Sequence, residues 1–327
     1  MRLLLIFILF VQLYTTVFGV QTVYISPFGS NQNPGTQEEP FLTLAQALLN
    51  ITQSNSFIYC FPGSYTGFGN IQVTINEPGL TIAPTSNIFE SVIFSGGDWF
   101  FNAKANITGI TFAYFNTGIN VQMPNVLINI QDCTFLGNKN SAAFTVSTGP
   151  NVQYNITKSL ISGGKYGLFA NLYASSYVFA FGTTFQGLTY PFYTTQGTEI
   201  ILENSMVQNC NSSISPIFLF NSILSASSSN FTNNIAQFGG VINANSTSVN
   251  LINCTLTNNH ASNSGGVIYL SNKSVLFAET SIFDTNSAST GAVAQCDSNS
   301  LVFASECILA NNSDSFPTSC KVNNYYQ

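Results

Sequence analysis

The chain has 327 residues, of which 45% are apolar and only 6% are charged. So little charge combined with so many apolar residues excludes an intrinsically disordered chain, despite the abundance of Asn, Ser and Thr. The formal net charge is −6 and the only arginine is Arg2, so the sequence offers no clustered positive charge and we expect no nucleic-acid partner.

Residues 1–19 have the features of a secretory signal peptide. Arg2 provides the positive start and residues 3–13 form the apolar stretch, so we expect cleavage after Gly19. An uncleaved anchor is the alternative, but polar residues end the apolar stretch well short of the ~20 residues of a spanning helix. We therefore expect a secreted, extracellular domain over 20–327, with no transmembrane segment in the mature chain.

Residues 20–56 differ from the repeats that follow. They contain YISPFGS at 24–30, NPGT at 33–36 and PFLTLAQA at 40–47, and IYCFPGSY follows at 58–65. These segments resemble the opening of many pectin-lyase-like proteins, in which a strand and a short helix cap the first coil. The resemblance implies an N-terminal cap over 20–56 with one short helix.

From residue 112 onward, one unit recurs about every 25 residues, a period typical of solenoids. The clearest copies begin FTNN at 231, LTNN at 256 and FDTN at 283, and each continues into a Gly-Gly or Gly-Ala turn and an apolar pair. The first residues of the units, here called anchors, are Phe112, Phe135, Ile161, Phe185, Val207, Phe231, Leu256, Phe283 and Leu309.

Three further positions align once the units are superposed on their anchors. Residues two, five and seven positions before the anchor are small or apolar in nearly every unit, and the alternation slips by one between them. Because side chains of a strand alternate with period two, the slip requires a bend. Gly182, Asn204 and Asn253 occupy this corner and tolerate a left-handed backbone.

The apolar pair after the glycine turn supplies a third strand in each unit. Three short strands per unit predict an all-β chain, namely a right-handed, single-stranded parallel β-helix. This three-sided solenoid would have about ten coils, each burying its four aligned positions against its neighbours.

The anchors and glycine turns between 229 and 293 also resemble the FxxN and GGAI repeats of polymorphic outer-membrane proteins, which are β-helical adhesins. The two resemblances bear on the fold and leave the activity open, because β-helices include lyases, hydrolases, esterases and inert adhesins.

Cys296 and Cys320 follow adjacent anchors at similar distances, so we expect them to form a disulfide that closes a C-terminal cap over 310–327. Cys60 and Cys210 have no assignment. Three other cysteines lie in the small inward column and are expected to be buried thiols: Cys133, Cys254 and Cys307.

Sequons for N-glycosylation occur throughout the chain, and a eukaryotic secretory route would modify several of them. They are Asn50, Asn106, Asn155, Asn211, Asn230, Asn245, Asn253, Asn272 and Asn311.

No motif for a cofactor, a metal ion or a catalytic triad is present, so we expect none of these. Asp132 and Lys158 fall at the same corner position of adjacent coils, where an exposed ion pair is expected rather than an acid and a base. Glu203 lies three coils from Asp132, about 14 Å at the strand spacing, which exceeds the separation of glycosidase carboxylates.

Two further candidates have similarly plain interpretations. Glu279 and Glu306 lie in adjacent coils and could approach each other, but solvated carboxylates are expected there. His260, the only histidine, is expected on the surface in a turn, because no nucleophile motif accompanies it.

Phe179, Phe277 and Phe303 lie six positions before their anchors and should point outward. Exposed aromatic rings can stack on sugars, whereas the alternative is that they fill the core and the loops. We therefore expect a non-catalytic, N-glycosylated β-helix that binds carbohydrate or a surface protein. The alternatives are a carbohydrate-active enzyme, either a polysaccharide lyase or a glycoside hydrolase, with an unrecognised site, and a structural coat component.

Overall fold

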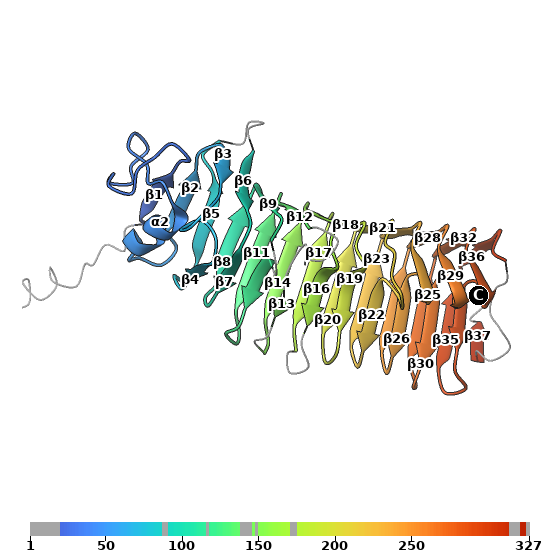
Figure 1. Ribbon diagram of the computed structural model, residues 1–327. Coiled ribbons are helices and arrows are strands. Elements are labelled where there is room, and N and C mark those ends of the chain that lie inside the picture. The colour runs from blue at the N-terminus through green and yellow to red at the C-terminus, as the bar shows by residue number, and fades with distance from the viewer. Residues whose placement is uncertain are drawn as a thin grey trace, which may run out of the picture.

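The chain folds into a rod of stacked coils, seen in a computed structural model (Figure 1). The structure describes residues 20–86, 91–115, 118–137, 146–147, 150–170, 175–313 and 321–324. For 146–147, 168–170 and 321–324 only the backbone is described. The expected signal peptide 1–19 and Cys320 lie outside the described residues.

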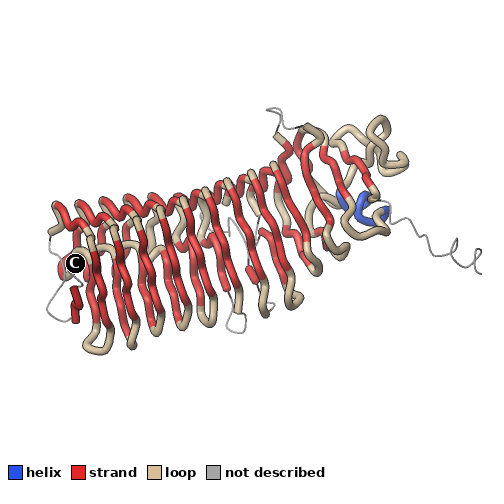
Figure 2. The backbone as a smooth tube through the Cα atoms, turned by 180° about the vertical axis from the view of Figure 1, so that it is seen from behind, coloured by secondary structure: helices blue, strands red, loops and turns tan. Residues whose placement is uncertain are grey.

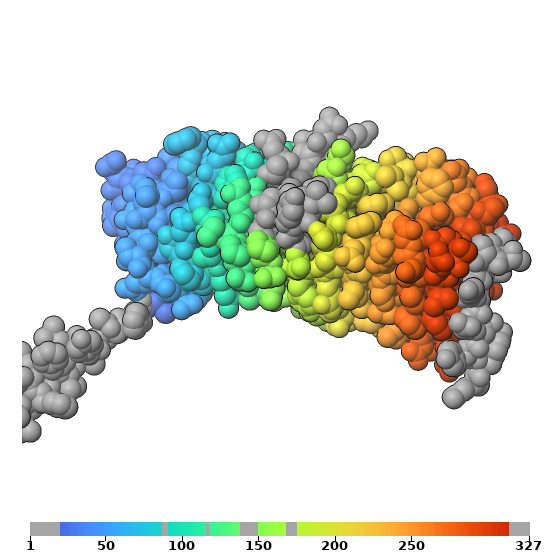
Figure 3. Space-filling view, turned by 90° about the horizontal axis from the view of Figure 1, so that it is seen from below, coloured from blue at the N-terminus to red at the C-terminus, as the bar shows by residue number. Residues whose placement is uncertain are grey.

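The expected right-handed parallel β-helix is confirmed. Strands from successive coils lie side by side in continuous rows along the rod (Figure 2), and neighbouring strands pair in parallel, for example Val249 opposite Leu276. Figure 3 shows the same rod as a continuous solid in which the coils follow one another in chain order. In the described part of the chain, sheets of 13, 11 and 10 strands form its three sides, in line with the ten or so coils expected.

Each coil contributes in turn to sheets I, II and III. Sheet I contains β1 Thr22–Ile25, β2 Phe57–Cys60, β5 Leu80–Pro84, β8 Ala105–Thr108, β11 Leu127–Gln131, β14 Gln153–Thr157, β17 Tyr177–Phe181, β20 Glu199–Glu203, β23 Ile223–Ser227, β27 Ser248–Ile252, β31 Val275–Glu279, β35 Leu301–Ser305 and β37 Lys321–Asn324. Sheet II contains β3 Gly63–Tyr65, β6 Val92–Ser95, β9 Ile110–Ala113, β12 Thr134–Leu136, β15 Leu160–Ser162, β18 Thr184–Gln186, β21 Met206–Gln208, β24 Asn230–Thr232, β28 Thr255–Thr257, β32 Ile282–Asp284 and β36 Ile308–Ala310.

Sheet III holds the strands that follow the glycine turns. It contains β4 Val73–Ile75, β7 Asp98–Phe101, β10 Gly118–Val121, β13 Val146–Ser147, β16 Tyr166–Ala170, β19 Tyr190–Thr194, β22 Ile217–Phe220, β26 Ile242–Asn245, β30 Ile268–Ser271 and β34 Ala294–Cys296. A short sheet IV, absent from our expectation, lies between sheets II and III in three coils: β25 Ile235–Phe238, β29 His260–Ser264 and β33 Ser287–Thr290.

The four aligned positions form buried columns, as expected. Phe231, Leu256 and Phe283 are consecutive anchors in register, and each is at most 1% exposed. The last anchor, Leu309, is an exception, because 42% of it is exposed. It lies on β36, the final strand of sheet II in the described chain, so no described strand of that sheet covers it.

The corner between sheets I and II lies where the phase slip placed it, three residues before each anchor. Its residues all adopt a left-handed backbone, with φ between 47° and 64°. Residues with side chains that disfavour this conformation also adopt it, because the strands on both sides fix the bend. The nine corner residues are Gly109, Asp132, Lys158, Gly182, Asn204, Ser228, Asn253, Thr280 and Glu306.

The small column two residues before the anchors is a hydrogen-bonded ladder. The Ser205 backbone N–H donates to Ser229 Oγ at 3.1 Å, and Ser205 Oγ donates to the Glu203 carbonyl at 2.9 Å. Cys254 takes the same place and its thiol donates to the Ile252 carbonyl at 3.4 Å. These residues are therefore small because they satisfy the corner's backbone groups, and not only because they fill the core.

A second ladder, of asparagines, closes the corner after sheet II. Asn234 and Asn259 are fully buried, and Asn259 Oδ1 accepts hydrogen bonds from both the backbone N–H and Nδ2 of Asn234 at 3.0 Å. Asn259 in turn bonds to Asn286, and Asn286 to Asn312. Identical amides stacked at the strand spacing thus pair with one another from coil to coil.

The N-terminal end of the rod is capped by a helix, α2 Leu44–Asn50, with Thr43 as its N-cap. Thr43 Oγ1 accepts a hydrogen bond from the Gln46 backbone N–H, and Leu44, Ala47 and Leu48 face the core. Among the described residues, no helix has the length and apolar character needed to cross a membrane.

Candidate functional site

The outward face of sheet I carries a ladder of amide side chains. Asn106, Asn129 and Asn155 lie opposite one another on β8, β11 and β14. Asn129 Nδ2 donates to Asn106 Oδ1 at 2.7 Å, and Asn155 Nδ2 donates to Asn129 Oδ1 at 2.9 Å. Since each amide nitrogen has two hydrogens, one donor per rung remains directed away from the ladder.

Two aromatic residues stand at the end of this ladder. Phe179 lies opposite Asn155 on β17, two residues after Tyr177, and both side chains are half-buried. Amides and aromatic rings together line a hollow of about 660 Å³. The strands that contribute them, from β8 to β17, are neighbours in sheet I (Figure 1). We call this hollow the amide groove, and its lining also includes Thr108, Gln131 and Thr157.

The described residues that line the amide groove are all uncharged. It offers hydrogen-bond donors, amide and hydroxyl acceptors, and an aromatic wall, but no carboxylate, lysine or histidine of the described residues lines it. Such a surface suits a ligand that has hydroxyl groups and an apolar face.

A second hollow lies on the same face near the C-terminal end of the rod. Phe277 and Phe303 stack with ring centroids 4.9 Å apart and an interplanar angle of 9°. Together with Asn250, Ile252 and Glu279, they line a hollow of about 350 Å³, here called the phenylalanine hollow. The expectation that Phe277 points outward is confirmed, because 46% of it is exposed.

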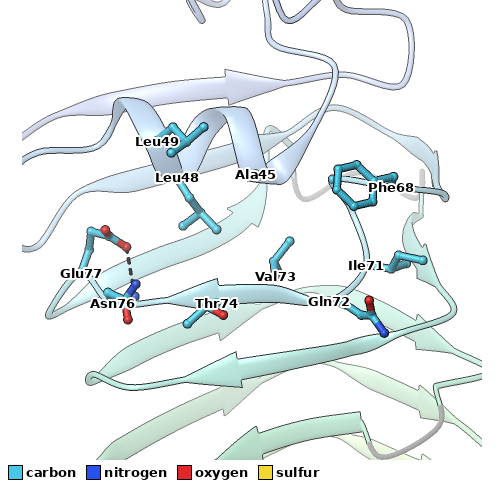
Figure 4. A pocket seen from close by; sticks show the side chains of 11 residues that line it. Ala45, Leu48, Leu49, Phe68, Ile71, Gln72, Val73, Thr74, Asn76 and Glu77 are labelled. Atoms are coloured by element: carbon cyan, nitrogen blue, oxygen red, sulfur yellow. Dashed lines mark hydrogen bonds between the residues drawn. The ribbon is translucent and has the colours of Figure 1, made fainter.

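A third hollow of about 350 Å³ lies at the N-terminal cap, between α2 and β4 (Figure 4). Leu48 and Val73 form its floor, while Leu49 and Phe68 are 78% and 98% exposed at its rim. Its one carboxylate, Glu77, accepts a hydrogen bond from the Asn76 backbone N–H. The hollow is therefore mainly apolar.

The carboxylates singled out from the sequence do not converge. Instead of the expected ion pair with Lys158, the Asp132 carboxylate accepts a hydrogen bond from Gln131 Nε2 at 3.0 Å, and the described residues show no ion pair between the two. Both residues occupy the left-handed corner, where the fixed backbone sets the direction of each side chain. Glu279 and Glu306 are exposed, as expected for solvated carboxylates.

His260 was expected in a turn, but it is the first residue of β29. The expectation was wrong because sheet IV was not anticipated. Its Nδ1 is 2.9 Å from Ser287 Oγ in the next coil, and the pair is exposed. No carboxylate is bonded to His260 in the described part of the chain. Groups of three or more metal-binding side chains are likewise not found among the described residues.

Four cysteine thiols are buried: Cys60, Cys133, Cys210 and Cys254. Burial raises the pKa of Cys133 and of Cys210 to about 12, and it raises the pKa of Cys60 further. Cys307 is partly exposed and also free. The Cys296–Cys320 disulfide stays a prediction, because Cys320 lies outside the described residues.

The sequons fall into two groups. Six are exposed, namely Asn50, Asn211, Asn230, Asn253, Asn272 and Asn311. Asn106, Asn155 and Asn245 are half-buried, and the first two are rungs of the amide ladder. A glycan on either of these two would occupy the amide groove.

The amide ladder was missed in the sequence, although a signal for it was present. Asn106, Asn129 and Asn155 share the outward column that holds Phe179, six positions before the anchor. Comparison of that column from unit to unit would have revealed three consecutive asparagines followed by an aromatic residue.

No family model matches the chain, and no curated protein matches its sequence. Its structure is similar to that of a GH136 lacto-N-biosidase from Eubacterium ramulus, with a TM-score of 0.50, 8% identity and coverage of 94% of this chain and 68% of that one. For pectate lyase Pel9A the TM-score is 0.47 at 14% identity, over 95% of this chain and 80% of that one. At such identities the similarity shows the β-helix fold alone. The resemblance to the repeats of polymorphic outer-membrane proteins stays a prediction.

Proposed function

We propose that this right-handed parallel β-helix is a secreted, non-catalytic protein that binds carbohydrate in the amide groove. The observation that carries the proposal is the ladder of Asn106, Asn129 and Asn155 ending against Tyr177 and Phe179. Amide donors and acceptors match sugar hydroxyls, and the aromatic wall matches the apolar face of a sugar ring.

The fixed geometry of the groove supports this proposal. Each amide is held by its neighbour on a rigid strand, so little side-chain freedom is lost when a ligand binds. The similarity in fold to a lacto-N-biosidase is consistent with a carbohydrate ligand. Secretion would follow from cleavage after Gly19, which N-terminal sequencing of the exported protein would test.

N-glycosylation is proposed for the exposed sequons and not for the two in the groove. A protein competent to bind must leave Asn106 and Asn155 unmodified, because a glycan on either would fill the site. Glycopeptide mass mapping of the secreted protein tests this directly.

The decisive experiment screens the purified protein against neutral and acidic glycans and compares Asn129→Ala with Gln208→Ala. Gln208 is a matched control, because its Nε2 also bonds to an amide in the adjacent coil, Gln186 Oε1 at 3.0 Å, but on sheet II. We expect Asn129→Ala to weaken binding at least about tenfold, the effect of one or two lost hydrogen bonds.

Equal binding by the two variants would place the site elsewhere. Release of sugars from any glycan of the screen would support the alternative of a carbohydrate-active enzyme. Self-association without binding of any glycan would support the structural coat component.

A further inference from the structure

The outward column of sheet I contains the same step twice. Asn155 on β14 lies opposite Phe179 on β17, and Asn250 on β27 lies opposite Phe277 on β31. In both places an amide rung is followed by an aromatic rung, and each step lines a hollow. Because all strands of the sheet run parallel, the aromatic rung follows the amide rung in the same direction along the rod in both hollows.

The distance between the two steps follows from the sheet order. Four strand-to-strand steps separate β14 from β27, and four separate β17 from β31. At the strand spacing this is about 19 Å along the rod. Ile201 and Ser225 occupy the column between them, and both are half-buried. No aromatic side chain of this column therefore stands between the two hollows.

The aromatic ring of the second hollow is held in place. Phe277 stacks on Phe303 in the next coil, so its other ring face is turned toward Asn250. Asn250 is itself fixed, because its Nδ2 donates to Ser225 Oγ at 3.3 Å. The phenylalanine hollow thus repeats the preorganised pairing of an amide with an aromatic face that is found in the amide groove.

Carboxylates flank the path from one hollow to the other. Glu199 and Glu203 lie on β20 on either side of Ile201, and Glu279 lines the phenylalanine hollow. The whole chain carries a net charge of −6. A polymer of uronic acids or sulfated sugars would be repelled along this path, whereas an uncharged one would not.

We infer that the outward face of sheet I holds one extended, uncharged polysaccharide that occupies both hollows at once. This inference rests on the proposed function, since it extends a sugar site in the amide groove to a two-site surface. Occupation of the second hollow becomes intramolecular once the first is filled. The polymer therefore binds about 100-fold tighter than a fragment that fills a single hollow, at the lower end of the gain expected for linked sites.

Calorimetry with matched fragments and polymers tests the inference. The probes are the disaccharides of β-1,4-linked glucose, mannose and xylose and uncharged, water-soluble substituted polymers with the same backbones. Polygalacturonate is the charged comparison. We expect two fragments per protein for the recognised sugar, a polymer about 100-fold tighter, and no binding of polygalacturonate.

Phe277→Ala is the informative variant, and Phe220→Ala is its control. Phe220 is 43% exposed and lies on sheet III, away from both hollows. Phe277→Ala should reduce fragment binding to one per protein and polymer affinity to nearly that of the fragment. The remaining fragment site shows that the variant is folded. Phe220→Ala should change neither value.

The two proposals fail in different ways. One fragment per protein, a polymer no tighter than the fragment and an inert Phe277→Ala would overturn the two-site inference and leave the amide groove as the site. Binding of polygalacturonate as tightly as the neutral polymer would overturn the requirement for an uncharged chain. Absence of binding to every fragment and polymer would refute the proposed function itself.

Discussion

Substitution of Asn259 by alanine should destabilise the rod strongly, although the residue belongs to a turn. Asn259 is fully buried, and its Oδ1 accepts two hydrogen bonds from Asn234. Its Nδ2 donates to the Phe231 carbonyl at 2.9 Å and to Asn286 Oδ1 at 3.1 Å. Alanine would remove all four hydrogen bonds and leave the backbone N–H of Asn234 buried without its acceptor.

The size of the effect follows from these contacts. A buried donor left unpaired costs about 1–3 kcal/mol, and each of the other lost hydrogen bonds adds about 0.5–1.5 kcal/mol before relaxation. Partial compensation is expected, because Asn286 Oδ1 still accepts from the Asn259 backbone N–H at 3.0 Å and Asn234 Nδ2 still donates to the Val207 carbonyl at 3.0 Å. We therefore predict a loss of about 3 kcal/mol.

Urea unfolding followed by far-UV circular dichroism measures this loss, with Asn258→Gly as the control. Asn258 is the exposed neighbour with φ of 54°, a conformation that glycine adopts freely, so its replacement should change the free energy of unfolding by less than about 0.5 kcal/mol. A loss below about 1 kcal/mol for Asn259→Ala would refute the reasoning that the asparagine ladder is a principal support of this corner.

Three further predictions concern thiols and charge. Cys133 and Cys210, whose pKa values burial raises to about 12, should resist iodoacetamide at mildly alkaline pH and react only after denaturation, as mass spectrometry would show. A non-reduced digest should contain Cys296 linked to Cys320, and two free thiols there would exclude the C-terminal disulfide. Burial raises the pKa of Asp297, but hydrogen bonds from Ser300 Oγ and from nearby backbone N–H groups outweigh it and lower the pKa overall. Asp297 should therefore stabilise the fold above its unfolded pKa of about 3.9 and lose this contribution as the pH falls through the lower folded value. The difference in urea midpoint between the wild type and Asp297→Ala should thus shrink under acid conditions, and a constant difference would contradict this assignment.

The regular part of the fold was predictable, because burial imposes a strict pattern on each coil. Phe231, Leu256 and Phe283 were recognised as one column since a stacked anchor must be apolar in every unit. The phase slip located the first corner to within one residue, because a strand cannot shift its alternation without a bend. Sheet IV was not predictable in this way: β25, β29 and β33 share one small apolar position in register, Ala236, Ala261 and Ala288, and otherwise no apolar alternation.

The candidate site was less accessible to sequence reasoning. Phe179 was identified as outward because a bulky ring six positions before the anchor is conspicuous, whereas Asn129 resembles any surface asparagine until its register with Asn106 and Asn155 is considered. The buried Asn234 and Asn259 were hidden for the same reason, since asparagine next to a turn is ordinarily exposed. Polar ladders depend on which residues face each other across coils; alignment on the anchors gives this register, but the side-chain hydrogen bonds between coils are known only from the structure.

The central claim is that sugar binds on the outward face of sheet I. A crystal structure of the protein with the oligosaccharide identified by the glycan screen tests it most directly. We predict sugar hydroxyls within hydrogen-bond distance of Asn129 and Asn155 and a ring face against Phe179. Sugar bound only on sheet II, on sheet III or in the apolar hollow beside α2 would contradict the claim.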